Sequence, residues 1–259
     1  MSEFFRGLAL VAANTVRELV RNKLLYNLLV FAVLLIASSF LVAQLTIGQW
    51  DRIILDMGLA AIEISGVLVA VLIGVGLVAG EIDRRTVFPT LAKPLTRGGF
   101  LLGRYAGLLA MLAVNVVIMM AVLTAMLRIA DYQLTRVVVA AAFLILLELA
   151  VMAATAMFFG SFTTPVLATA FSLSLFLIGH LLGDLQAFGS RTHSGLARAL
   201  ATAAYRLLPD LELFNLKSLA SNELPLPPGL TSTATLYGVA YTGVLLVLAV
   251  TIFRARDLK

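Results

Sequence analysis

The chain has 259 residues, of which 61% are hydrophobic and 13% are charged, and its formal net charge is +5. Soluble domains have about 45–50% apolar and about 25% charged residues, so this chain has too few polar side chains to cover a water-facing surface, and a bilayer must be its solvent. The absence of cysteine excludes disulfides and thiolate metal sites, and the basic residues gather at the ends of apolar segments, which argues against a nucleic-acid partner.

The first 23 residues predict an amphipathic helix that lies in the headgroup plane of the membrane. On a helical wheel, Phe4 and Leu8 fall on one side, whereas Arg6 and Arg17 fall on the other. The charged stretch is too long for a cleavable signal peptide, and the apolar run after it is a full span. The alternative interpretation is a basic flank that happens to be helical.

Six apolar segments are long enough to cross a bilayer, because about 20 residues at 1.5 Å per residue cover the ~30 Å hydrocarbon core. The predicted spans are residues 24–47, 57–80, 105–127, 137–159, 166–182 and 231–253. No soluble domain or linker is visible. The expected fold class is therefore an all-α integral membrane protein, with residues 1–259 forming one transmembrane domain.

Basic residues set the predicted orientation, because Lys and Arg near span ends are held on the cytoplasmic side. With the N-terminus inside, the inner segments hold most of the Lys and Arg residues. Many of the others lie in one long outer loop, and the charges of long loops have little influence on orientation. We therefore expect both termini in the cytoplasm. The outer connections are then residues 49–56, 128–136 and 183–229, and the inner connections are residues 81–104 and 160–165.

The longest outer connection, residues 183–229, predicts a helix of its own. An apolar stripe at helical spacing runs from Leu196 to Leu207, and Pro209 then ends the pattern. This segment could dock an extracytoplasmic partner.

Two carboxylates lie within predicted spans, where a charge at the bilayer centre costs at least ~2.5 kcal/mol. Glu148 is near the middle of its span, and Asn115 lies at matching depth in the preceding span, so we expect a hydrogen bond between them. Glu148 would then either join helices or serve a substrate path or proton relay. Glu63 lies near the level of Gln44, close enough to the outer boundary for its carboxylate to reach water.

Small residues recur at four-residue spacing in the second predicted span, where they let helix backbones approach closely. The residues are Gly66, Ala70, Gly74, Gly76 and Gly80. They predict a tight helix contact or a subunit interface. The alternative is that glycine is simply common in membrane helices.

Several catalytic motifs are missing from the sequence. No lysine follows a glycine, so the chain cannot form a Walker A loop, and it has no H-E-x-x-H pair or G-x-S-x-G elbow. The two histidines, His180 and His193, are too few for a usual catalytic zinc site, so we expect both to be structural and expect no metal. The chain is therefore predicted not to be an enzyme.

The most informative segment is the inner connection between the second and third spans. It combines charges with Pro89 and Pro94, and a short charged piece between two span ends can pass a soluble partner's motion to two helices at once. A basic orientation anchor would explain its arginines but not the ordered apolar-Pro-Lys-Pro pattern. Eight residues of this segment stand out by their charge or their place in the pattern: Glu81, Asp83, Arg84, Arg85, Thr86, Phe88, Lys93 and Arg97.

This segment resembles the E-x-x-R-x-T, L-x-K-P-hydrophobic-[ST]-R and F-hydrophobic-hydrophobic-G-[KR] pattern of ABC-2 type permeases. The three parts begin here at Glu81, Leu91 and Phe100. The nearest likeness is to permeases of multicopper-enzyme maturation, such as the membrane subunit of the nitrous-oxide-reductase maturation transporter. The number of spans, the amphipathic first helix and the long outer loop extend the resemblance loosely over the whole chain.

The resemblance implies a permease subunit in a bacterial inner membrane that pairs with a second copy and binds two cytosolic ATPase subunits. Those subunits would hold ATP and Mg, and this chain would hold no cofactor. The coupling helix would be residues 81–91, and the eight residues that stand out in the segment would couple it to the ATPase. Residues 160–165 would make a second, smaller contact. Export is the usual direction in the family, and the cargo stays unread.

Two rival functions stay open from the sequence. One is a proton-coupled secondary transporter that uses Glu148, although no inverted repeat or broken-helix pair supports it. The other is a membrane scaffold that docks an outer partner through residues 183–229.

Overall fold

The structure is a computed structural model that describes residues 2–45, 50–84, 96–129, 132, 134–192 and 194–255, and these residues contain helices and no strand. The helices are α1 (Ser2–Leu19), α2 (Lys23–Ala43), α3 (Trp50–Arg84), α5 (Arg97–Ile129), α6 (Arg136–Gly160), α7 (Pro165–His180), α8 (Leu182–Arg191), α9 (Gly195–Leu207), the 3-10 helix η1 (Glu212–Phe214), α10 (Lys217–Ser221) and α11 (Leu230–Ala255). The all-α prediction is confirmed for the described residues.

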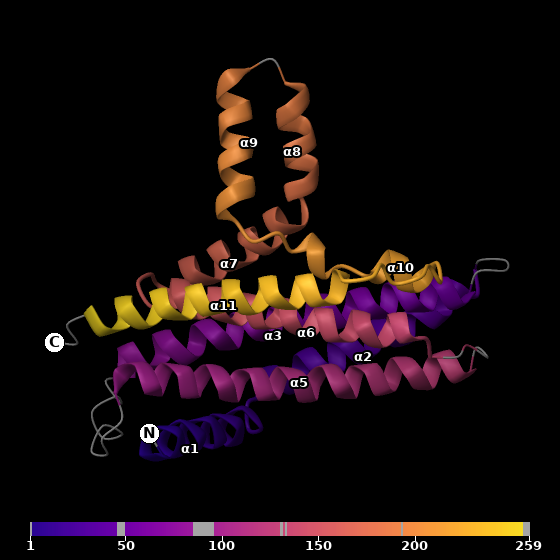
Figure 1. The fold of residues 1–259 in the computed structure, drawn as a ribbon. Helices are drawn as coiled ribbons and strands as arrows, with labels where there is room; N and C mark the ends of the chain where they lie inside the picture. The colour runs from indigo at the N-terminus through magenta and orange to yellow at the C-terminus, as the bar shows by residue number, and fades with distance from the viewer. Residues whose placement is uncertain are drawn as a thin grey trace.

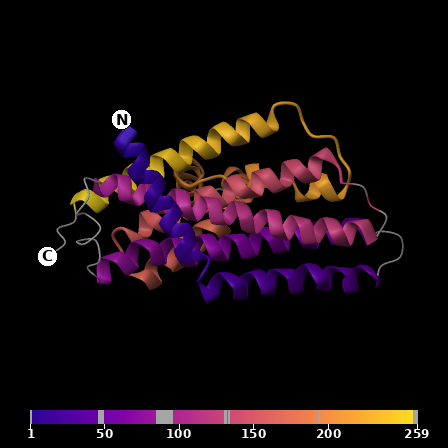
Figure 2. The ribbon, with the colours of Figure 1, turned by 90° about the horizontal axis from the view of Figure 1, so that it is seen from below.

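Within the described part of the chain, five helices form a bundle and are each long and apolar enough to cross a membrane: α2, α3, α5, α6 and α11. They lie side by side in Figures 1 and 2. The end of the bundle at which α5 begins is called the Arg97 end below. In lipid only a helix satisfies all its backbone groups internally, so each apolar run is helical along its length.

The fifth predicted span, residues 166–182, is broken. α7 has 16 residues and begins with Pro165, a residue suited to the first helical turn because its missing N–H would have no partner there. Alone it is too short for a span, and it reaches the length of one only together with the first part of α8, after a bend of 62°. The predicted continuous span over residues 166–182 is therefore wrong beyond His180.

The two long helices α3 and α5 extend past the predicted spans. They contain 35 and 33 residues, which at 1.5 Å per residue correspond to about 52 and 50 Å. The predicted outer turn 49–56 is helical from Trp50 onward, and the predicted inner loop 81–104 is helical through Arg84 and again from Arg97. These corrections share one cause: a helix can continue into water with charged side chains, where hydropathy no longer marks it.

The predicted N-terminal helix is present as α1, and it runs obliquely across α5 in Figure 2. Two glycines of α5 allow this close approach, because a Cβ on Gly103 would lie 2.7 Å from the Val11 Cβ and one on Gly107 would lie 2.6 Å from the Thr15 Cβ. Phe5 stays 64% exposed, which leaves apolar surface for lipid. The location of α1 in the headgroup plane of the membrane stays a prediction.

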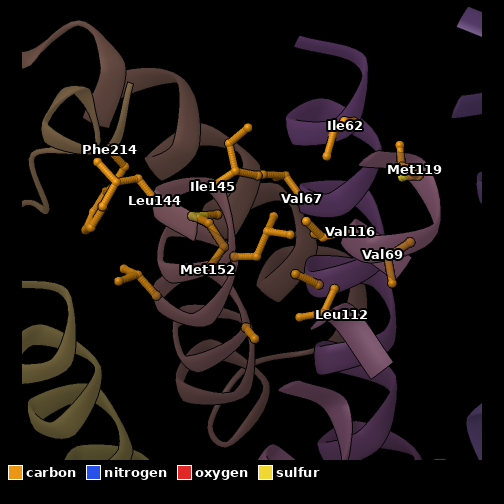
Figure 3. Packing of buried hydrophobic residues seen from close by; sticks show 14 of the residues in the cluster. Ile62, Val67, Val69, Leu112, Val116, Met119, Leu144, Ile145, Met152 and Phe214 are labelled. Atoms are coloured by element: carbon orange, nitrogen blue, oxygen red, sulfur yellow. The ribbon is translucent and has the colours of Figure 1, made fainter. Parts of the chain in front are cut away.

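The core of the bundle lies between α3, α5 and α6. Figure 3 shows side chains of these helices and of η1 pointing toward one another, among them Ile62, Val116, Ile145 and Phe214. α3 and α6 are mostly buried, whereas α2 and α11 keep much of their apolar surface outside. The two central helices therefore position whatever lies within the bundle.

The predicted long outer loop is mostly helical. α8 and α9 form a hairpin that stands away from the bundle, across the direction of its helices (Figure 1). The helix predicted before Pro209 is confirmed as α9, and Ala201 packs where a Cβ on Gly189 would lie, at 2.6 Å. Leu196 and Leu207 are 72% and 74% exposed, so the apolar stripe of α9 is largely uncovered within the chain.

The segment after α9 folds back onto the bundle. Leu211 and Phe214 are fully buried, and a Cβ on Gly179 would lie 2.7 Å from the Leu211 Cγ. The Asp210 backbone N–H donates to the Tyr237 hydroxyl at 2.8 Å, which ties the segment to α11. η1 and α10 thereby pack against α6, and α10 also packs against α3.

Candidate functional site: a buried ionic cluster

Four ionisable side chains from four different elements meet inside the bundle. Glu63 belongs to α3, Glu148 to α6, His180 to the last residue of α7, and Lys217 to the first residue of α10. At 1.5 Å per residue, Glu63 lies about 20 Å along α3 from its first residue, and Glu148 lies about 18 Å along α6 from its first residue. Such a position is expensive for a charge unless a partner compensates it.

Glu63 connects two of the other groups through its two oxygens. The Lys217 ammonium donates to Glu63 Oε2 in a short ion pair. On the other oxygen, Oε1, the His180 Nε2 lies 3.2 Å away. The same Nε2 lies 3.6 Å from Glu148 Oε1, so the imidazole faces both carboxylates.

The imidazole is oriented by its other nitrogen. His180 Nδ1 lies 3.1 Å from the Phe176 carbonyl oxygen, one helical turn earlier. A carbonyl only accepts hydrogen bonds, so Nδ1 carries the hydrogen and donates it. In the neutral imidazole, Nε2 then presents a lone pair to the two carboxylates.

The cluster is almost closed to its surroundings. The side chains of Glu148 and Glu63 are 1% and 4% exposed, and those of His180 and Lys217 are 18% and 19% exposed. Glu148 Oε1 and His180 Nε2 are buried and have no hydrogen-bond partner. Two carboxylates and one ammonium leave a negative charge uncompensated, so the cluster needs a further proton or cation.

The predicted hydrogen bond between Glu148 and Asn115 is wrong. The Asn115 amide nitrogen is buried without a partner, and Glu148 Oε1 faces His180 instead. Depth along two antiparallel helices says how far each residue lies from the membrane surface, but not which way it faces around the helix axis. That rotation is decided by packing.

The prediction that Glu63 reaches water is also wrong. Its side chain is closed off, because the segment after α9 folds over α3 and brings Lys217 to it. His180, expected to be structural, forms the junction of the cluster. His193 lies outside the described residues. No local signal marked Lys217 or His180 as partners, since each stands alone in its segment.

The small residues of α3 divide into two groups. A Cβ on Gly66 would lie 2.6 Å from Leu149 Cδ1, and a Cβ on Gly74 would lie 3.0 Å from the Ala156 Cβ, both on α6. Ala70, between them, is fully buried. This part of the pattern makes a close helix contact within the chain, whereas a Cβ on Gly76 or Gly80 would have nothing within 4 Å.

Four of the eight predicted coupling residues are described by the structure, and they lie at the Arg97 end. Glu81, Asp83 and Arg84 continue α3, although their side chains are outside the described part, and Arg97 begins α5 as a half-buried residue. The other four are Arg85, Thr86, Phe88 and Lys93, which lie outside the described residues.

The last part of the sequence motif holds α1. Gly103 makes room for Val11, and Arg104, 8% exposed, forms a short ion pair with Glu18. The Arg104 guanidinium also lies 5.3 Å from the centre of the Phe100 ring. The sequence motif thus includes a docking site for the first helix, which its one-dimensional pattern did not reveal.

A bundle of at least five membrane-crossing helices with charges enclosed at its centre defines a multi-pass membrane protein. A sequence profile of the ABC-2 family transporter proteins matches residues 9–258, and the chain belongs to this family. It is therefore a transmembrane permease component of an ABC transporter, a transport component that is not itself catalytic and that associates with an ABC ATPase subunit. No curated protein sequence matches the chain.

Proposed function

We propose that this chain is the permease subunit of an ATP-driven exporter in a bacterial inner membrane. Two copies would form the membrane part, and two cytosolic ATPase subunits would bind ATP and Mg below it. The observation that carries the proposal is the family match over residues 9–258. The excess of Lys and Arg in the predicted inner segments supports placing both termini in the cytoplasm.

Coupling would begin at residues 81–91, which start in the last turn of α3 and continue into the connection toward α5. Each of these helices is about 50 Å long, longer than the ~30 Å hydrocarbon core. A displacement of the segment that connects them would therefore move two helices that cross the whole membrane. α1 is tied to α5 by the Glu18–Arg104 ion pair, so it would move with that helix. The connection 160–165 between α6 and α7 would be a second contact.

The motion of α3 would reach the centre of the bundle through α6. Where Gly66 and Gly74 face Leu149 and Ala156, the two backbones approach closely, and such a contact transmits displacement because protein interiors have few voids to absorb it. Glu63 and Glu148 lie on these two helices, so the ionic cluster would respond to the ATPase cycle. The likeness of the inner segment to multicopper-enzyme maturation permeases favours that subtype of the family.

The experiment replaces Arg84 and Arg85 with glutamate in the native chromosome and purifies the tagged chain from its membrane. We expect ATPase activity to copurify with the parent and to be lost with the charge-reversed variant, because a basic contact would become repulsive. The matched control reverses Arg198 and Arg206, two exposed arginines of α9, and should keep the ATPase. Equal ATPase activity in both variants would contradict the proposed coupling segment.

A second measurement tests the orientation. The chain has no cysteine, so Lys93→Cys and Glu223→Cys each give a single labelling position. In spheroplasts, whose inner membrane is intact, a membrane-impermeant maleimide should label Glu223→Cys and should not label Lys93→Cys. Labelling of Lys93→Cys from outside would overturn the proposal, and cargo flux driven by a proton gradient without ATP would favour the secondary transporter instead.

A further inference from the structure

We propose that Glu63, Glu148 and His180 form a binding site for one divalent transition-metal ion inside the bundle. Lys217 is the outer partner that holds the Glu63 carboxylate in place. The inference rests on the geometry of these four side chains and is independent of the exporter proposal.

The spacing of the ligand atoms fits a metal ion. Zinc binds imidazole nitrogen at about 2.0–2.1 Å and carboxylate oxygen at about 2.0–2.2 Å, so neighbouring ligands of a tetrahedral ion lie roughly 3.3–3.6 Å apart. His180 Nε2 lies 3.2 Å from Glu63 Oε1 and 3.6 Å from Glu148 Oε1. One ligand atom from each of the three residues lies within 4.8 Å of the others.

Two of the three ligand atoms lack a hydrogen-bond partner. Glu148, with a side chain 1% exposed, directs Oε1 toward the imidazole, and this oxygen has no hydrogen-bond partner. His180 Nε2, although close to both carboxylates, also has no aligned hydrogen bond. A lone pair that faces two carboxylate oxygens is repulsive, and an ion placed between the three atoms removes that repulsion.

The surrounding groups have the arrangement that metal ligands usually have. A metal-bound histidine donates its other ring N–H to a carbonyl or carboxylate, and a metal-bound carboxylate is itself hydrogen-bonded. His180 Nδ1 donates to the Phe176 carbonyl, and Lys217 donates to Glu63 Oε2, which leaves Oε1 for the ion. Lys217 therefore orients a ligand and does not occupy the metal position.

The ligand set selects the class of ion. One imidazole with two carboxylates suits Zn²⁺, Mn²⁺, Fe²⁺ or Co²⁺, whereas Cu(I) prefers sulfur ligands. With a neutral imidazole, the two carboxylates and the Lys217 ammonium carry a net charge of about −1, and a divalent ion changes it to about +1. The remaining coordination positions then suit water or an anion.

The site would join two parts of the fold. Glu63 and Glu148 lie on the central helices, while His180 ends α7 and Lys217 begins α10. The partial exposure of His180 and Lys217 leaves an approach to the ion where α7 stops. A bound ion would pin the segment after α7 to α3 and α6.

The test uses the purified full chain in nanodiscs, with a tag free of histidine, stripped with EDTA and titrated with Co²⁺ and Zn²⁺. We expect one equivalent of Co²⁺ per chain to produce visible d–d bands of a four- or five-coordinate ion, and Zn²⁺ to abolish them. Glu148→Gln and His180→Gln should each weaken Zn²⁺ binding more than about 100-fold, and Lys217→Met should weaken it about 10–100-fold.

The matched controls are Asp184→Asn and Glu212→Gln, which remove exposed carboxylates outside the cluster and should leave the Co²⁺ spectrum unchanged. If a ligand variant fails to fold, the parent alone decides the question. A parent that shows no d–d bands at one equivalent, or a folded Glu148→Gln variant that binds Zn²⁺ as tightly as the parent, would overturn the proposal.

Discussion

Replacing Gly107 with alanine should loosen α1 from α5. The new Cβ would lie 2.6 Å from the Thr15 Cβ and 2.8 Å from the Ala12 carbonyl oxygen. The second contact is with backbone, which cannot rotate away as a side chain could. α1 must therefore move by about 1 Å to restore ordinary carbon contacts of roughly 3.5 Å.

The magnitude follows from overpacking, which costs about 1–3 kcal/mol. The higher helix propensity of alanine does not offset this cost, because α5 is helical whether α1 is docked or not. A loss of about 1–3 kcal/mol in the docking of α1 raises the population of undocked α1 by a factor of about 5–150. Local opening of this kind leaves the bundle folded.

The assay measures this opening directly. Thr15 is fully buried, and in this cysteine-free chain Thr15→Cys is a single reactive position whose maleimide labelling rate reports the undocked fraction. The rate should rise by the same factor when Gly107→Ala is added. Gly76→Ala is the matched control, because its Cβ meets nothing within 4 Å. An unchanged rate with Gly107→Ala would refute the argument from close approach.

Three further predictions concern buried polar groups. Lys217→Met leaves the buried Glu63 carboxylate without its ammonium partner and should lower the free energy of unfolding, measured by SDS titration, by about 3–5 kcal/mol. Adding Glu63→Gln should restore most of that loss, and equal midpoints for the single and double variants would show that the two residues are uncoupled. Tyr105→Phe removes the bond from the buried hydroxyl to the Ala150 carbonyl, 3.1 Å long, and should cost about 0.5–1.5 kcal/mol in the same titration. Burial raises the pKa of the Asp210 carboxyl above its ordinary 3.8. The protonated carboxyl therefore stabilises the fold fully below pH 3.8, and this contribution is lost as the pH rises through the pKa of the folded state. Asp210→Asn should remove this fall from a plot of the SDS unfolding midpoint against pH.

The helices themselves were largely predictable, because apolar length and helical periodicity are local properties. Five membrane-crossing helices and α9 follow from them. The limits of the helices were less predictable: α3 begins at Trp50 and α5 at Arg97, several residues before their apolar runs. Charged residues at these ends are equally compatible with a loop and with a helix that leaves the membrane.

The carboxylates of the cluster could be found from the sequence, but their partners could not. Glu63 and Glu148 stand out because a charge in an apolar run is costly. The expected partner, Asn115, matches Glu148 in depth, but its amide nitrogen makes no hydrogen bond. The observed partners come from the end of a broken helix and from a segment that folds back.

By itself, the sequence determined the solvent of this protein, its helical class, the positions that carry unusual charge and the motif that relates it to ABC-2 permeases. Each of these depends on residues that are near neighbours along the chain. The tertiary structure alone decided that α7 stops at His180, that α1 docks on Gly103 and Gly107, and that Lys217 meets Glu63 across 154 residues. Such contacts depend on how each packed helix is rotated about its own axis, and no local sequence pattern specifies that rotation.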